Sequence, residues 1–212
     1  MTWYANRIYV NASPLALAVL RAEPALRGHL FLLQGTLPTS WEQGGAELEL
    51  APGGLAVVKE IGPPASDETP AAESHEWYSP GERLSWDSLR GSREVAVMAP
   101  SIEELMECDR PPRRFLQFLA ELRARCEQPV TYYLGRTWGG DMEGEAAWVF
   151  ADRQVLYCHR TPDEVVVVDG DGRRLARGDV LRLALANHGL HLPTGYFAPH
   201  TRGFDWATRR LS

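Results

Sequence analysis

The sequence predicts an α+β fold whose sheet is mainly antiparallel and built from hairpins, with helices packed on one face. Strand-like segments outnumber helical ones along the 212 residues. Turn sequences accompany the strand candidates: PGG at 52–54 lies between two of them, and DGDG at 169–172 ends another. Residues 112–126 have the apolar spacing of an amphipathic helix.

The first part of the chain predicts a β-α-β unit. Residues 3–10 alternate polar and apolar side chains and are rich in β-formers, which indicates a strand. Ser13 and Pro14 are a typical N-cap and first helical residue, and Pro24 is expected to end or kink the helix that follows. The apolar run HLFLLQ at 29–34 suits a buried strand.

A second hairpin and a linker are expected next. Residues 47–50 and 55–61 are two strand candidates on either side of the PGG turn. The segment after them is rich in Pro, Ala and acids and has no periodicity. We therefore expect an N-terminal β-α-β-hairpin subdomain (residues 1–61), a loop or linker (62–82) and a C-terminal α+β subdomain (83–212). The two subdomains are either two similar halves or one continuous domain.

The second part also begins with a strand and a helix. Residues 93–99 alternate as a strand does, and Ser101 with Glu104 forms a capping box for a helix. The helix at 112–126 presents an apolar stripe of Phe115, Phe118, Leu119, Leu122 and Cys126. Beyond it, residues 130–159 predict three strands joined by tight turns, residues 165–168 a buried strand, and residues 179–188 a helix that ends at Gly189.

Composition limits the functional classes. The net charge of −6 argues against a nucleic-acid-binding protein, which normally has a basic face. Lys59 is the only lysine beside many arginines, a bias typical of a GC-rich, bacterial genome. Three cysteines without a CxxC pair suit buried thiols in a reducing compartment. No signal peptide and no apolar run of about 20 residues occurs, so we expect a cytoplasmic protein without membrane contact.

The strands at 130–159 carry the most distinctive side chains. The acidic triplet (Asp141, Glu143 and Glu145) alternates along one strand, which predicts that all three carboxylates lie on one face. That face is an acidic patch for a basic partner, a divalent-metal site, or simply a solvated surface. Tyr132 and Tyr133 must point to opposite faces of the sheet, and an exposed tyrosine beside acids is typical of a binding hot spot.

The sequence contains no GxSxG, SxxK, HExxH, GxGxxG or phosphate-binding loop. His188 and His191 have HxxH spacing, but a histidine at a helix C-terminus is explained by the helix dipole. We therefore assign no catalytic residue, metal or cofactor. A rival hypothesis is an enzyme whose unfamiliar site unites His159 and His200 with Asp141 and Glu145.

The segment VTYYLGRTWGGDMEGEAAWVFADRQVLYC resembles bacterial immunity proteins, which are encoded beside polymorphic or contact-dependent toxins. The resemblance rests on Tyr132, Tyr133, Gly139, Gly140, Glu145 and Trp148. It implies a non-enzymatic protein that binds a toxin, in many cases a basic one, and occludes it. The predicted partner-binding surface combines Tyr132, Tyr133 and Trp138 with the acidic triplet. A third alternative is an interaction domain of a larger assembly.

Overall fold

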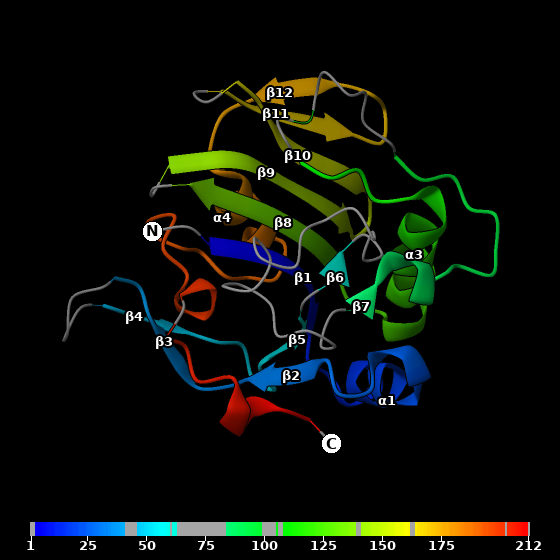
Figure 1. Cartoon of the computed structure of the whole chain (residues 1–212), viewed down its shortest axis with the longest axis vertical. Helices are drawn as coiled ribbons and strands as arrows, with labels where there is room; N and C mark the ends of the chain where they lie inside the picture. Colours follow the sequence, from blue (N-terminus) through cyan, green and yellow to red (C-terminus); the bar gives the residue numbers. More distant parts are fainter. Residues whose placement is uncertain are drawn as a thin grey trace, which may run out of the picture.

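A computed structural model describes residues 3–40, 46–59, 61–62, 84–98, 105, 108–138, 141–161, 164–201 and 203–211. Its main sheet has eight strands in the order β12-β11-β10-β9-β8-β1-β5-β2 (Figure 1). Every neighbouring pair in it is antiparallel. The strands are β1 (Trp3–Asn11), β2 (Leu30–Leu33), β5 (Leu55–Val58), β8 (Val130–Trp138), β9 (Asp141–Phe150), β10 (Gln154–Thr161), β11 (Glu164–Asp169) and β12 (Arg174–Ala176).

Smaller elements surround this sheet. Two short strand pairs are β3 (Thr36–Pro38) with β4 (Glu47–Glu49), and β6 (Ile61–Gly62) with β7 (Leu84–Ser85). The helices are α1 (Pro14–Ala22), α3 (Arg113–Cys126) and α4 (Val180–Ala186). The 3₁₀ turns are η1 (Pro24–Leu26), η2 (Trp86–Ser88), η4 (Ala198–His200) and η5 (Ala207–Arg209). No helix within the described ranges is long and apolar enough to cross a bilayer.

The predicted α+β class with a mainly antiparallel sheet is confirmed, but the helices lie on both faces. The apolar sides of α1 and α3 pack on one face, in the core that contains Tyr132 and Trp148. Helix α4 and the C-terminal segment pack on the other face, over Tyr133 and Ala147. The central strands are buried on both sides, so β9 has a continuous apolar run at 146–150 instead of strict alternation.

Strand β1 joins the two parts of the chain in one sheet. It pairs with β5 on one side and with β8 on the other, so strands from residues 1–61 and 83–212 share hydrogen bonds. The predicted hairpin of 47–50 with 55–61 is wrong, because β4 pairs with β3 while β5 pairs with β1 and β2. The glycines of the PGG turn have positive φ angles, as the tight connection into β5 requires.

Residues 93–98 do not form the predicted strand. Side chains of α3 and β10 hold this segment instead. The Gln117 Nε2 group donates to the Val95 carbonyl (3.3 Å). The Gln154 side chain donates from Nε2 to the Ala96 carbonyl (2.8 Å) and accepts at Oε1 from the Met98 N–H (3.1 Å). Alternation alone does not show whether a neighbouring strand is available to pair. The capping box at Ser101 and Glu104 lies outside the described residues.

Candidate functional site

A group of three polar side chains, two of them buried and one partly exposed, lies on the sheet face that α4 covers. We call it the Glu145 cluster: Tyr133 of β8, Glu145 of β9 and His159 of β10. The Tyr133 hydroxyl donates to Glu145 Oε1 at 2.8 Å, and His159 Nε2 lies 3.0 Å from Glu145 Oε2. Tyr133 and Glu145 are buried, and the His159 side chain is 13% exposed. The cluster therefore spans three adjacent strands and reaches the surface at His159.

Strand register explains how these residues meet. Glu145 lies opposite Gly135 on β8, and the Ala146–Cys158 pair places His159 beside it on β10. Tyr133 and Gly135 are two residues apart, so they share a face. A Cβ on Gly135 would lie 2.5 Å from the Tyr133 hydroxyl oxygen. The glycine thus leaves the space through which Tyr133 reaches Glu145.

Glu145 also caps helix α4 from a different element. Asp179, the N-cap residue, makes no side-chain capping bond. Instead, the backbone N–H of Leu181 donates to Glu145 Oε1 at 3.0 Å. The first N–H groups of a helix have no partner within the helix, so this carboxylate satisfies one that would otherwise be buried without an acceptor. Glu145 therefore fastens α4 to the sheet.

The surroundings of Tyr133 keep its hydroxyl protonated. Burial raises its pKa well above the usual value, and the Glu145 charge and the hydrogen bond to Glu145 raise it further. A protonated hydroxyl is the donor that the 2.8 Å contact needs. Both carboxylate oxygens of Glu145 thus accept hydrogen bonds from within the protein. Tyr133, the Leu181 N–H and His159 together occupy about three of the four acceptor sites of the carboxylate, so Glu145 is held by its contacts within the fold.

A second buried group adjoins the first. The Tyr9 hydroxyl lies 2.6 Å from His200 Nε2, and the His200 ring stacks on Tyr133 with centroids 5.1 Å apart. Burial raises the pKa of Tyr9 to about 12. Burial, with the nearby Arg7 charge, lowers the pKa of His200 well below its usual value. Both shifts favour a neutral tyrosine–imidazole pair. Arg7 donates to the Pro199 carbonyl at 2.7 Å and so holds the C-terminal segment against β1.

The structure brings together part of the rival enzyme site. Of its four residues, Glu145 and His159 are in direct contact, and His200 is one ring away, across Tyr133. The side chain of Asp141 lies outside the described part of the structure. Two cavities among the described residues, of about 530 and 270 Å³, are lined by other residues.

The predicted exposure of a tyrosine is wrong. Tyr132 and Tyr133 do point to opposite faces, but each is fully buried because both faces are covered. Tyr132 accepts a hydrogen bond from the Trp86 indole N–H at 3.0 Å and packs edge-on against Phe115. Neither tyrosine, nor the buried Glu145, forms part of an accessible binding surface in this structure.

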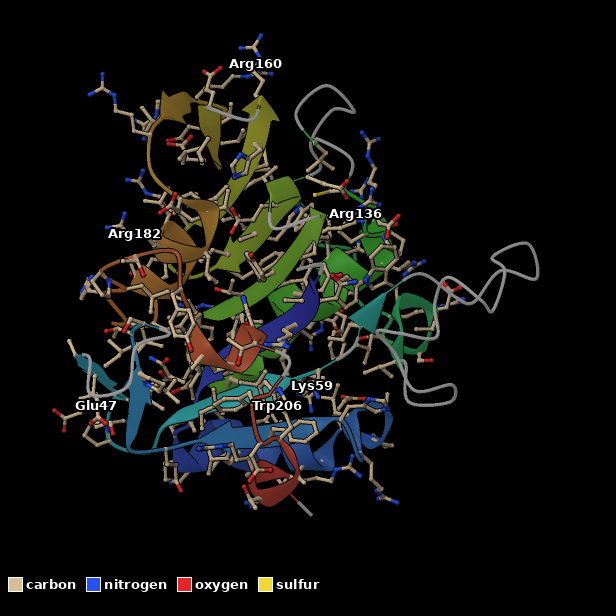
Figure 2. The ribbon with its side chains drawn as sticks, turned by 60° about the vertical axis from the view of Figure 1, so that its left-hand side comes forward. Glu47, Lys59, Arg136, Arg160, Arg182 and Trp206 are labelled. Atoms are coloured by element: carbon tan, nitrogen blue, oxygen red, sulfur yellow. The ribbon has the colours of Figure 1, made fainter. Side chains whose placement is uncertain are left out.

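The acidic triplet does not follow one uninterrupted alternation. Arg136 pairs with Gly144 and Trp138 with Asp141, so β9 has one additional residue, Glu143, at a bulge. The Glu143 side chain is 27% exposed and accepts a 2.6 Å hydrogen bond from Arg136 Nε. Figure 2 shows Arg136 near the end of the β8–β9 hairpin. The side chain of Trp138 lies outside the described residues, so its predicted role stays a prediction.

His188 is not explained by the helix dipole, which would require a charged ring. Burial lowers its pKa to about 4, so the ring is neutral near pH 7. Its Nε2 lies 2.8 Å from the Thr131 hydroxyl, and its Nδ1 lies 3.0 Å from Asn11 Oδ1. His191 is exposed. Among the residues that can be described, no three His, Cys, Asp or Glu side chains are placed to hold a metal ion.

Sequence reasoning missed Arg7, Tyr9 and the Leu181 N–H. The first two come from β1, far from His200 in sequence, and nothing local marks them as its neighbours. A usable signal was Gly135, because a glycine inside a strand often marks a close approach of another group.

Comparison of the chain with models of known protein families, with curated proteins and with solved structures finds no match.

Proposed function

We propose that this chain is a non-enzymatic protein-binding protein of the bacterial cytoplasm, and that it is an immunity protein which occludes a toxin. One observation carries the preference over an enzyme. Among the described residues, the Glu145 carboxylate contacts the His159 imidazole and also accepts hydrogen bonds from Tyr133 and the Leu181 N–H. These contacts give the carboxylate a structural task, which is to join three strands and one helix.

The net charge of the chain and the β8–β9 hairpin further support the proposed binding of a basic partner. The net charge of −6 suits a basic partner, because opposite net charges accelerate encounter. The partner-binding surface that we propose is the end of the β8–β9 hairpin, around the partly exposed Glu143 and Arg136. The resemblance of this hairpin to immunity proteins supports the same location.

The test uses the product of the reading frame adjacent to the gene as the candidate toxin. The purified chain is titrated against the toxic activity, and light scattering measures the mass of any complex. Occlusion predicts an end point at equal molar amounts and a stable complex. Glu143→Arg is expected to weaken binding about tenfold, mainly through slower association. Absence of both complex and neutralisation would contradict the proposal.

An enzyme is the second candidate, because His159 contacts Glu145 at 3.0 Å and keeps 13% of its side chain exposed. A catalytic protein would neutralise its target at far less than equal molar amounts, since one molecule acts repeatedly. The same titration therefore separates the two functions.

A further inference from the structure

A small cavity is lined by residues of α1, β2, the region of η1 and the C-terminal segment. Figure 1 shows these elements at the same end of the sheet. The cavity volume is about 270 Å³. Its apolar lining comes from Leu20, Leu26, Leu30 and Leu211. These side chains belong to four different segments, so the cavity exists only in the folded chain.

Three arginines line the same cavity: Arg21, Arg27 and Arg210. All three are exposed, and no carboxylate is among the lining residues. Within the described ranges, none of the three forms an ion pair. Arg21 is also in the last turn of α1, where a positive charge offsets the helix dipole. That explanation does not extend to Arg27 and Arg210.

The C-terminal wall of the cavity is fixed by backbone hydrogen bonds. The Leu211 N–H donates to the Leu30 carbonyl at 2.9 Å, and Arg210 forms an isolated bridge with Phe31. The Arg210 guanidinium lies 5.5 Å from the centre of the Phe31 ring. Lys59 lies over the same ring and over Trp206, at 5.1 and 4.7 Å, and Figure 2 shows Lys59 beside Trp206. Arg210 and Lys59 therefore lie over the same aromatic ring beside this cavity.

We propose that this cavity binds a small aliphatic carboxylate, with its chain on the leucines and its carboxylate on the arginines. Leucine side chains favour an aliphatic body by removing it from water. Guanidinium groups match the geometry of a carboxylate and bind it through paired hydrogen bonds. Pockets for drug-sized ligands measure roughly 300–1,000 Å³, so a cavity of about 270 Å³ suits a smaller ligand.

The experiment is a calorimetric titration of the full chain with octanoate, kept below the concentration at which it forms micelles. Saturable binding tighter than about 1 mM is expected. Octylamine tests the need for negative charge, and acetate tests the need for the aliphatic chain. Each is expected to bind at least about tenfold more weakly, because each lacks one of the two interactions.

Arg27→Gln with Arg210→Gln removes two charges from the cavity, and octanoate affinity should fall by about tenfold or more. Arg160→Gln is the matched control, because Arg160 is exposed and lies at the opposite end of the molecule (Figure 2). It should leave the affinity unchanged. Urea unfolding verifies that each variant is folded, and Arg21→Gln serves as a second variant if the double variant is not. No saturable octanoate binding, equal binding of octylamine, or unchanged affinity in the folded arginine variants would overturn the proposal.

Discussion

Replacing Glu145 with alanine removes the acceptor for the Tyr133 hydroxyl, the Leu181 N–H and His159 Nε2. Tyr133 is fully buried and the Leu181 N–H bond is buried, so water does not readily take the place of the carboxylate. A buried donor that loses its partner costs about 1–3 kcal/mol. For three donors, with some relaxation at the less buried His159, we expect a loss of about 3–6 kcal/mol in the free energy of unfolding. Natural domains have about 5–15 kcal/mol in total.

The assay is equilibrium unfolding in urea, followed by far-ultraviolet circular dichroism. Glu143→Ala is the matched control, two residues away on the same strand. Its ion pair with Arg136 is partly exposed, so its loss should cost at most about 1 kcal/mol. The two variants should unfold at different urea concentrations. The slope of the free energy of unfolding against urea concentration should be the same for both. A Glu145→Ala variant no less stable than Glu143→Ala would refute the structural role assigned to this carboxylate.

The remaining predictions concern other buried positions. Gly135→Ala should displace the Tyr133 hydroxyl and lower the thermal midpoint by as much as Tyr133→Phe or more; an unchanged midpoint would contradict the close approach. The pKa of His188 is about 4 when folded and about 6.5 when unfolded, so the unfolded chain binds more protons and stability falls as pH drops below about 6.5. Between pH 7 and pH 5 this difference lowers the free energy of unfolding by about 2 kcal/mol, and the His188→Gln variant should lack that decrease. Urea unfolding at both pH values measures it. Tyr132→Phe should cost about 1–3 kcal/mol in urea unfolding, because the Trp86 N–H loses its acceptor; a cost near zero would contradict the 3.0 Å hydrogen bond.

The fold class was predictable because hairpins and amphipathic helices leave local patterns. Turn sequences marked the β11–β12 connection, and the apolar stripe of α3 marked a helix of nearly the observed length. The placement of α4 on the second face was not predictable in this way. It depends on which core the helix joins, and only the apolar run at 146–150 indicates that β9 is covered on both sides.

Fewer contacts of the site could be predicted, because some of them join residues that are far apart in the sequence. The pairing of Glu145 with His159 follows from the length of one hairpin, so careful register counting along 145–159 would have found it. The contact of Tyr9 with His200 joins opposite ends of the chain and leaves no local signal. The bulge at Glu143 interrupts the alternation from which a single acidic face was predicted, and a bulge cannot be recognised from alternation.

The central claim is that the end of the β8–β9 hairpin binds a partner while the Glu145 cluster only supports the fold. Affinity for the candidate toxin, compared between Glu143→Arg and His159→Asn in folded protein, tests it most directly. The account predicts that Glu143→Arg weakens the complex about tenfold and that His159→Asn binds and neutralises as the unmodified chain does. Loss of neutralisation in folded His159→Asn, with full activity in Glu143→Arg, would contradict it.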